Sequence, residues 1–414
     1  MKRERHDLVI IGGGPAGLAA AIAAKKAGCT DLVIIERDRI LGGILNQCIH
    51  DGFGLHTFKE ALSGPEYAER FIDEVYQMNI QVIERAIVLD LSKDKVLRIS
   101  LEGEIKEIEA KAVILAMGCR ERTRGALSIP GHRPAGIYTA GMVQNLVNLE
   151  NIMPGKNICI LGSGDIGLIM ARRMTLEGAH VKAVFEVLPY SSGLQRNIRQ
   201  CLDDYNIPLY LSTTVVDING PKGRLEGVTV ASVDDKRNPI HGTEKYVECD
   251  TLLLSVGLIP ENELSREADV LIDDITQGAV VDDACMTGIP GIFACGNVLH
   301  VHDLVDFVSK EAAKAGANAA KYITGQLPIS QHEVTVKPGN EVRYVVPQKI
   351  KYGKDISLAF RVSVPSRNRL IRVVSDGKLI REEKKLRLHP AEMVWVKLGN
   401  IDTSDIDTLE VSVE

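Results

Sequence analysis

The chain has 414 residues, of which 45% are hydrophobic and 25% charged, and its formal net charge is −6. This length exceeds one ordinary domain, so the composition predicts a globular protein of two or three domains. The acidic balance gives no support for nucleic-acid binding, and no apolar run is long enough to span a membrane. The eight cysteines show no CxxC or CxxxxC spacing, which argues against a zinc site, an iron–sulfur cluster or a disulfide framework and favours a reducing cytoplasm.

The N-terminal segment contains a complete dinucleotide-binding pattern, DLVIIGGGPAGLAAAIAAKKAGCTDLVIIE at residues 7–36. The pattern predicts a buried strand, a glycine turn, an alanine-rich helix and a second strand that ends on an acid. Gly12 permits the tight turn, Gly14 lets the backbone approach a pyrophosphate, and Gly17 lets helix and strand pack closely. The amides at the helix N-terminus can hold phosphate charge, and Glu36 can accept the ribose hydroxyls.

A basic start followed by small apolar residues also imitates a secretory signal peptide. Such a peptide needs neither three glycines and a proline in its apolar region nor a second strand that ends on an acid. The dinucleotide interpretation therefore explains more of the pattern.

The same pattern recurs at residues 156–186. An apolar strand precedes Gly-Ser-Gly-Asp-Ile-Gly at 162–167, and a helix and a second strand then lead to Glu186. The acid follows the last glycine by 19 positions in both copies, from 17 to 36 and from 167 to 186. Two units in register within one chain predict two nucleotide sites, the alternative for each being a βαβ unit without a ligand.

The segments around these units predict further elements. A glycine-punctuated loop follows Glu36. The other predicted elements are a helix at 64–78, a β-meander at 80–110, buried parallel strands at 111–118, 250–257 and 291–297, an antiparallel flap at 215–250 and a helix at 310–324. After residue 328, alternating runs separated by turns predict an all-β region, in which Trp395 packs in the core.

Together these motifs resemble the flavoproteins with two dinucleotide-binding domains, the pyridine nucleotide–disulfide oxidoreductase superfamily, over residues 5–328. The first glycine loop resembles its FAD adenosine site, and Ala-Met-Gly at 116–118 stands where the family has an ATG segment. The second loop with Glu186 resembles its inserted nicotinamide domain. The run TGIPGIFACGN at 287–297 resembles the second FAD motif, with Asn297 in place of the usual aspartate; an amide can still hydrogen-bond there.

This resemblance implies the cofactors FAD and NAD(H). It also implies the residues that contact them: Gly12, Gly14, Pro15, Ala16, Gly17, Glu36, Arg37, Gly43, Gln47, Met117, Gly118, Gly162, Gly164, Asp165, Ile166, Gly167, Glu186, Gly257, Gly296 and Asn297.

The implied fold class is α/β, with two Rossmann-like three-layer domains and a C-terminal all-β domain. The FAD-binding domain would be discontinuous, at residues 1–122 and 258–328, with the NAD(H)-binding domain inserted at 123–257. Residues 329–414 would form a small β domain outside the resemblance, which is a candidate for partner contact.

Two shorter stretches narrow the resemblance. Residues 120–141 carry Arg-Glu-Arg, Pro-Gly and Gly-Ile-Tyr-Thr-Ala-Gly, and they resemble the flavin subunits of opine, proline and sarcosine dehydrogenase complexes. Residues 42–50, GGILNQCIH, resemble flavoproteins that accompany a glycerol-3-phosphate dehydrogenase-like oxidoreductase. Both comparisons imply a chain that works with a partner dehydrogenase subunit, and an oligomer is compatible with them.

The implied chemistry is hydride transfer between a nicotinamide and FAD. Glu186 would accept the adenosine ribose hydroxyls and repel a 2′-phosphate. Since no arginine cluster follows it, NADH is favoured over NADPH.

Cys48 and His50 are candidate catalytic residues in the flavin-side loop. In related NADH oxidases, NADH peroxidases and coenzyme A disulfide reductases a single cysteine near this position is redox-active, and His50 would stabilise a thiolate. The alternative is that Cys48 packs in the interior and His50 is a hydrogen-bonded loop residue. His300 and His302, near the expected pyrimidine edge of the flavin, either steady the charge of reduced flavin or are structural.

Three functions therefore remain open. The first is an FAD-dependent NADH dehydrogenase or oxidase subunit that exchanges electrons with a partner. The second is a free-standing single-cysteine reductase of peroxide, oxygen or a small disulfide. The third is an inactive nucleotide-binding scaffold.

Overall fold

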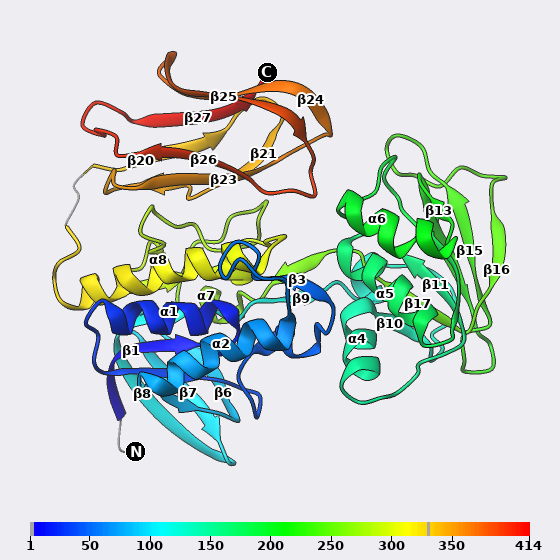
Figure 1. The fold of residues 1–414 in the computed structure, drawn as a ribbon, viewed down its shortest axis with the longest axis horizontal. Coiled ribbons are helices and arrows are strands. Elements are labelled where there is room, and N and C mark those ends of the chain that lie inside the picture. The colour runs from blue at the N-terminus through cyan, green and yellow to red at the C-terminus, as the bar shows by residue number, and fades with distance from the viewer. Residues whose placement is uncertain (1–3, 329–331) are drawn as a thin grey trace. The chain divides into compact units, whose positions relative to one another are not determined.

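The computed structural model describes residues 4–328 and 332–414 and divides into two compact units (Figure 1). Unit 1 comprises residues 1–119 together with 260–414, and unit 2 comprises residues 120–259.

The chain passes between the units twice, and the two passages pair with each other as β9 (Cys119–Glu121) and β18 (Leu258–Pro260). Among the residues that the structure describes, no helix combines the length and the apolar character needed to cross a membrane.

The core of unit 1 is a sheet that buries apolar side chains on both faces. Its strands are β1 (Glu4–Ile11), β2 (Leu32–Ile35), β5 (Gln81–Ile83), β6 (Ala86–Leu91), β7 (Val96–Leu101), β8 (Glu104–Leu115) and β19 (Ile292–Ala294). The order is β5-β2-β1-β8-β7-β6, with β19 parallel to β8 on a branch; β6, β7 and β8 form the antiparallel meander. Along β1, Leu8 and Ile10 join one apolar layer and Val9 and Ile11 the other, as the two-residue period of a strand requires.

Two helices lie side by side on one face of this sheet, α1 (Pro15–Lys26) and α8 (Val305–Ile323) (Figure 1). A Cβ at Gly316 would overlap the carbonyl oxygen of Ala20, so this glycine lets the two backbones approach. The predicted start of α8 at residue 310 is wrong by five residues. Asp306, in the first turn, accepts the amides of Gly54 and Thr57 at 3.3 and 2.7 Å, and these contacts fix a beginning that small-residue content did not signal.

The loop after Glu36 is more regular than predicted. It contains η1 (Gly43–Gln47) and a short hairpin of β3 (Asp51–Phe53) and β4 (Leu62–Ser63) before α2 (Gly64–Gln77). Ser63 and Glu66 cap α2 reciprocally, so this predicted helix begins where expected.

Unit 2 is a parallel sheet covered by helices, joined to an antiparallel flap. The sheet has the order β10 (Ile137–Thr139), β17 (Thr251–Leu254), β11 (Asn157–Leu161), β12 (His180–Phe185), β13 (Leu209–Tyr210). Its helices include α3 (Arg124–Leu127), α4 (Ala140–Asn148), α5 (Asp165–Leu176) and α6 (Gln195–Cys201). The flap is β14 (Thr213–Asn219), β15 (Gly227–Ser232) and β16 (Lys245–Glu248), as the sequence predicted.

The C-terminal region consists of two sheets that share one apolar core. The first has the order β22 (Lys349–Ile350), β20 (Val334–Pro338), β27 (Thr408–Val413), β24 (Ser366–Ser375), β25 (Lys378–Leu388), and the second β21 (Val342–Val346), β23 (Ile356–Val362), β26 (Val394–Gly399). The predicted fold class, α/β with Rossmann-like sheets and an additional β-rich C-terminal region, is confirmed.

These C-terminal strands belong to unit 1 and pack into it. Tyr344 and Met393 share an apolar cluster with Leu299, and the Trp395 ring lies 5.3 Å from the Phe307 ring of α8. Asp283 accepts three consecutive backbone amides, those of residues 351–353, at 2.8 to 3.3 Å.

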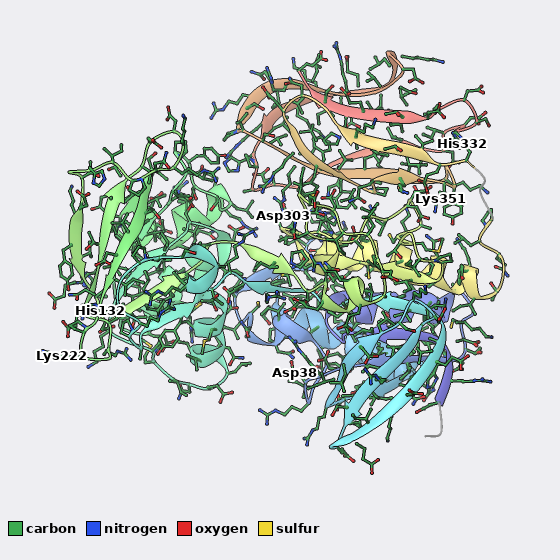
Figure 2. The ribbon with its side chains drawn as sticks, turned by 180° about the vertical axis from the view of Figure 1, so that it is seen from behind. Asp38, His132, Lys222, Asp303, His332 and Lys351 are labelled. Atoms are coloured by element: carbon green, nitrogen blue, oxygen red, sulfur yellow. The ribbon has the colours of Figure 1, made fainter. Side chains whose placement is uncertain are left out.

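Polar contacts join the same two regions elsewhere. Asp303 accepts the amide of Met393 at 3.1 Å and lies 3.7 Å from the guanidinium of Arg361. Asp303 and Lys351, whose contacts link the C-terminal strands to the rest of unit 1, are labelled in Figure 2.

Asp282 makes the stability of unit 1 depend on pH. Burial raises the pKa of Asp282 to about 6, because only one of its oxygens accepts amides and the nearest cation, Lys351 Nζ, is 3.6 Å away. The folded state therefore binds a proton on Asp282 more tightly than the unfolded state does. This proton stabilises the fold fully below a pH of about 4, and the stabilisation is lost as the pH rises to about 6 and above.

We expect Asp282→Asn to raise the apparent melting temperature at pH 7.5 and to flatten this pH dependence. The free energy involved is up to about 3 kcal/mol from the size of the pKa shift. The matched control is Asp283→Asn, which should lower the melting temperature at the same pH because it weakens three charge-assisted hydrogen bonds. Equal melting temperatures for Asp282→Asn and the parent at pH 4.5 and 7.5 would contradict the assignment.

Candidate dinucleotide sites

The first glycine loop brings β1 and α1 into backbone contact. Gly12 has a φ of +104°, and a Cβ there would lie 2.6 Å from the carbonyl oxygen of Ala116. A Cβ at Gly17 would overlap the carbonyl oxygen of Gly12. Both positions therefore require glycine for the turn and for helix packing.

The N-terminus of α1 is suited to an anion. Its N-cap, Gly14, offers no side-chain cap, Pro15 occupies the first turn, and that turn holds no acid. The nearest atom to a Cβ at Gly14 is the Cα of Gly43, 3.9 Å away. The backbone is thus open where the amides and the helix dipole favour negative charge.

Glu36 is fixed at the end of β2, where its side chain points back at the loop. One carboxylate oxygen accepts the amide of Gly13 at 2.6 Å and the other accepts that of Asp38 at 2.8 Å, and the residue is only 6% exposed. Arg37, the next residue, is exposed.

The segment around η1 crosses this loop. Gly43 has a φ of +57°, and its Cβ would lie 3.0 Å from the Cα of Gly14. Gln47, the last residue of η1, is buried. The structure therefore brings Gly43 to the first glycine loop, from which it is distant in sequence.

The second sequence motif of unit 1 meets the start of α1. Gly296 has a φ of +71°, and a Cβ there would lie 2.8 Å from the Cβ of Ala16. Asn297 uses both ends of its amide: Oδ1 accepts the amide of His302 at 3.0 Å, and Nδ2 lies 3.6 Å from Cys119 Sγ. Asn297 thus orders the loop that follows η3 (Gly296–Val298).

Met117 and Gly118 follow the C-terminal end of β8. Gly118 has a φ of +73° and its carbonyl oxygen accepts the amide of Glu261 at 3.1 Å. Met117 packs against one of the two apolar layers of unit 1.

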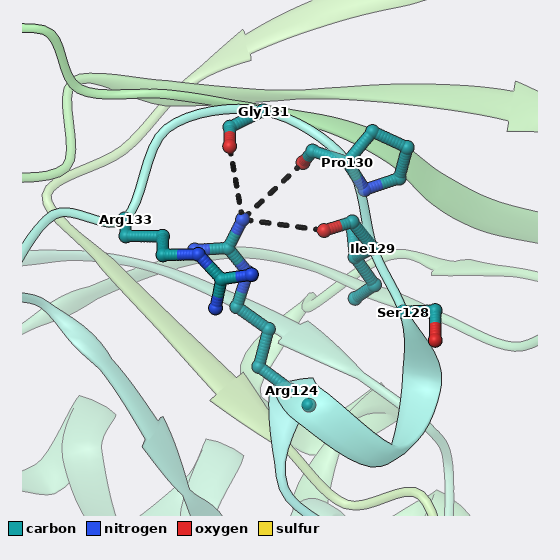
Figure 3. Close-up of a pocket in the computed structure, with 7 residues that line it drawn as sticks. Arg124, Ser128, Ile129, Pro130, Gly131 and Arg133 are labelled. Carbon is teal, nitrogen blue, oxygen red and sulfur yellow. Dashed lines mark hydrogen bonds between the residues drawn. The ribbon is translucent and has the colours of Figure 1, made fainter.

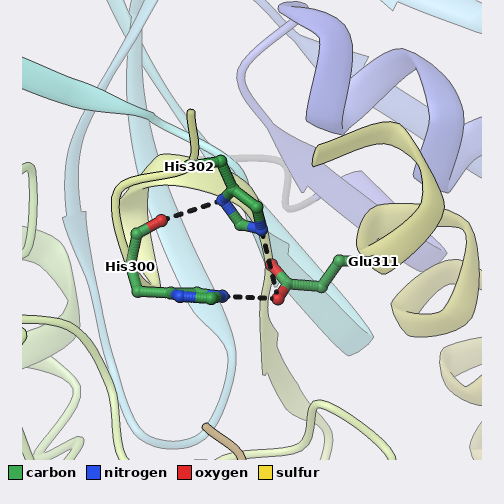
Figure 4. A group of neighbouring side chains, drawn as sticks. All are labelled: His300, His302 and Glu311. Carbon is green, nitrogen blue, oxygen red and sulfur yellow. Dashed lines mark hydrogen bonds and ion pairs between the residues drawn. The ribbon is translucent and has the colours of Figure 1, made fainter. Parts of the chain in front are cut away.

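Next to Asn297, three side chains meet that the sequence had not joined, His300, His302 and Glu311 (Figure 4). His300 Nε2 lies 2.8 Å and His302 Nε2 3.5 Å from the same carboxylate oxygen of Glu311. Burial lowers the pKa of His300. Burial alone would raise the pKa of Glu311, but His300 and His302 hold it well below its usual range.

Cys48 directly follows η1 and is buried. Its thiol donates to the carbonyl oxygen of Ile44 at 3.3 Å, and burial raises the pKa of Cys48 to about 12. A stabilised thiolate requires the opposite shift. The His50 ring lies 5.0 Å from the ring of Phe53.

The second glycine loop, in unit 2, closes around Ser255. A Cβ at Gly162, whose φ is +96°, would overlap the carbonyl oxygen of Ser255. The hydroxyl of Ser255 accepts the amide of Gly167 at 3.0 Å and lies 3.3 Å from a Cβ built at Gly164. Gly257 follows with a φ of +101°, and its carbonyl accepts the amide of Arg122.

Glu186 is held by more donors than the sequence suggested. One carboxylate oxygen accepts the amide and the hydroxyl of Ser163 at 2.9 and 2.5 Å and the hydroxyl of Ser192 at 2.9 Å. The other accepts the amide of Leu188 at 3.0 Å, and the residue is 4% exposed. Hydrogen bonds of this kind hold the Glu186 carboxylate in one orientation just after the end of β12.

Asp165 ties the start of α6 to the glycine loop. Its Oδ1 accepts the amide of Leu194 at 2.8 Å and the side-chain amide of Asn197 at 2.7 Å. Gly193 lies against the loop, because its Cβ would be 2.7 Å from the carbonyl oxygen of Ser163. Ile166 is half-buried behind it.

Sequence reasoning missed Ser163, Ser192, Asn197 and Glu311. The one available signal was Ser-Ser-Gly at 191–193, small turn residues shortly after an acid that ends a strand.

Unit 2 also holds a hollow of about 400 Å³ near α3 (Figure 3). The guanidinium of Arg124 donates to the carbonyl oxygens of residues 129–131 at 3.2 to 3.4 Å. Burial and the neighbouring charge of Arg133 lower the pKa of Arg124. Arg124 therefore shapes the Pro-Gly turn noted in the sequence.

The model of the family described as Pyridine nucleotide-disulphide oxidoreductase matches residues 6–320. The hydrogen cyanide synthase subunit HcnB of Pseudomonas protegens is 26% identical over 283 residues, which cover 63% of this chain and 58% of HcnB. An opine oxidase subunit of Agrobacterium tumefaciens is 24% identical over 281 residues, which cover 64% of this chain and 54% of the opine oxidase chain.

The chain thus spans little more than half the length of these two curated relatives. The crystal structure of T. acidophilum thioredoxin reductase matches with a TM-score of 0.64 and 24% identity, over 77% of this chain and 99% of that one. This structural likeness concerns the fold.

Proposed function

The chain belongs to the pyridine nucleotide-disulphide oxidoreductase family, and from that premise we propose that it transfers hydride between NAD(H) and FAD as one subunit of a larger dehydrogenase or NADH oxidase complex. The family uses FAD and NAD(P)H. The observation that carries the proposal is the pair of glycine loops, each followed by a buried acid at the end of the next strand.

In this proposal FAD occupies unit 1 and NAD(H) occupies unit 2, so the FAD-binding domain is discontinuous. The uncapped α1 N-terminus and the open position at Gly14 support a pyrophosphate in unit 1. FAD, when bound, supplies the hydride acceptor. Glu36 would receive the adenosine ribose there, and Asn297 would order the loop beside the flavin.

In unit 2 the glycine loop and Glu186 would bind the adenosine half of NADH. The bonds from Ser163 and Ser192 keep the carboxylate in place. Asp165 and the residues it holds would position the segment after Glu186 against the nucleotide.

The subunit role rests on relatives and on the region beyond the family match. HcnB and the opine oxidase chain are both named as subunits, and the narrower resemblance to opine, proline and sarcosine dehydrogenase complexes points the same way. The C-terminal strands lie beyond residue 320 and are our candidate for contact with a partner dehydrogenase. A cytoplasmic location is part of the same proposal.

An anaerobic titration of the purified, flavin-containing protein with NADH tests the core of this proposal. Stoichiometric bleaching of the flavin absorbance is the expected result. A purified protein that neither retains nor rebinds FAD would favour the inactive scaffold instead. Co-expression with the genomic neighbours, followed by a screen of acceptors, then separates the subunit role from a free-standing enzyme.

Cys48 distinguishes the two enzymatic alternatives. Burial raises the pKa of the Cys48 thiol, which disfavours a thiolate. We therefore expect Cys48→Ser to reduce every acceptor used by the parent at a rate within twofold of the parent's rate. The matched control is Cys29→Ser, another cysteine whose pKa burial raises, outside this loop. Loss of acceptor reduction in Cys48→Ser alone, with flavin reduction by NADH intact, would establish the single-cysteine reductase.

A further inference from the structure

His300, His302 and Glu311 converge from the loop after η3 and from the second turn of α8 (Figure 4). Their side chains are 1%, 1% and 9% exposed. One ligand atom from each residue lies within 4.8 Å of the other two. Two imidazoles and a carboxylate thus share one buried position.

The hydrogen bond at Nδ1 of His302 leaves Nε2 as the ring atom that faces Glu311. His302 Nδ1 lies 3.0 Å from the carbonyl oxygen of His300. A carbonyl only accepts, so Nδ1 carries the hydrogen and Nε2 of the neutral ring presents a lone pair. That lone pair faces a Glu311 oxygen at 3.5 Å, which is also an acceptor. In the neutral form of the ring two buried acceptors therefore face each other, and either a proton on Nε2 or a bound metal cation would satisfy both of them.

We propose that this triad binds one divalent first-row transition-metal ion, Zn²⁺ in the first instance, through His300 Nε2, His302 Nε2 and one carboxylate oxygen of Glu311. Two imidazoles with one carboxylate are a ligand set of such ions. Ligand atoms at zinc distances of about 2.0–2.1 Å lie roughly 3.3 Å apart in a tetrahedron, and the two nitrogen–oxygen separations here are 2.8 and 3.5 Å.

The surroundings orient two of the three ligands. His302 donates its other ring nitrogen to a backbone carbonyl, the usual support of a metal-bound imidazole. The second oxygen of Glu311 accepts the amide of Gly296 at 2.8 Å, which leaves the first for the metal. The nearby guanidinium of Arg361 donates to the carbonyl oxygens of Val301 and Pro390.

The metal would join the loop of Asn297 to α8, and its binding is measured by metal content and stability, apart from the hydride transfer proposed above. The test uses the full chain with its flavin, equilibrated with Zn²⁺ and freed of excess by gel filtration. Elemental analysis should find about one Zn²⁺ per chain. Removal by a chelator should lower the apparent melting temperature by several degrees, and added Zn²⁺ should restore it.

The ligand variants His302→Gln and Glu311→Gln should retain less than one tenth of a Zn²⁺ per chain. The matched control, His389→Gln just after β25, should keep the full amount. Equal metal content in all variants would mean adventitious binding and would overturn the proposal.

The parent protein alone also decides the question, should a buried variant fail to fold. No bound metal and no change in melting temperature with Zn²⁺, Co²⁺, Mn²⁺ or Fe²⁺ would overturn the site and leave a shared proton between His302 and Glu311. Flavin bleaching by NADH, measured in the same samples, keeps this outcome separate from failure of the proposed function.

Discussion

Gly14→Ala should weaken FAD binding by about 100-fold while leaving the flavin-free protein as stable as its parent. The reason is geometric: the new Cβ meets nothing of the protein nearer than 3.9 Å, and the backbone there has an ordinary φ of −77°. A methyl group at that position would instead keep a pyrophosphate from the α1 amides. The loss corresponds to about 2.8 kcal/mol of binding free energy, measured by titrating the apoprotein with FAD.

Two further glycine variants control this result. Gly17→Ala should destabilise the flavin-free protein itself, because its Cβ would overlap the carbonyl oxygen of Gly12. Gly125→Ala in unit 2, whose new Cβ would meet only the hydroxyl of Thr123 at 3.7 Å, should change neither stability nor FAD affinity. FAD affinity in Gly14→Ala within threefold of the parent would show that the pyrophosphate lies elsewhere.

The second large effect concerns nicotinamide selectivity. We expect kcat/KM for NADH to exceed that for NADPH at least tenfold, because the Glu186 carboxylate would repel a 2′-phosphate. One decade corresponds to about 1.4 kcal/mol, which one desolvated charge can supply. Glu186→Gln keeps the shape of the side chain and removes its charge, so the ratio should fall toward one.

Ser192→Ala is the control for this charge effect. It removes one hydroxyl donor from the Glu186 carboxylate but leaves the charge and the Ser163 bonds in place. Its NADH-to-NADPH ratio should stay within threefold of the parent value. Equal rates with both nucleotides in the parent, or an unchanged ratio in Glu186→Gln, would remove the basis of the assignment.

What the sequence predicted well depends on neighbours in the chain. The glycine loops, their helices and the acids at the strand ends arise within 30 or 31 consecutive residues, and the fold class and the family follow from them. Alternating apolar residues likewise predicted the C-terminal strands.

The features that sequence reasoning missed depend on contacts between residues that are far apart in the chain or joined by irregular turns. Glu311 meets His300 and His302 only because α8 begins at Val305 and turns that carboxylate toward the preceding loop. The absence of zinc-type cysteine spacing therefore did not bear on this site. Ser192 reaches Glu186 through a turn of irregular backbone, for which no periodic pattern exists.

Unit 1 is assembled from both ends of the chain, and this order matters while the protein is being synthesised. The first 119 residues leave the ribosome before any of unit 2. At that stage β8 lacks its neighbouring strand β19, and α1 lacks α8, the helix that it packs against. The apolar layer that includes Leu299 stays incomplete until Tyr344 and Met393 of the C-terminal strands have been synthesised. Unit 2 is continuous and can complete its core first. We therefore expect the half-made unit 1 to expose apolar surface and unpaired strand edges during synthesis, which makes it prone to aggregate.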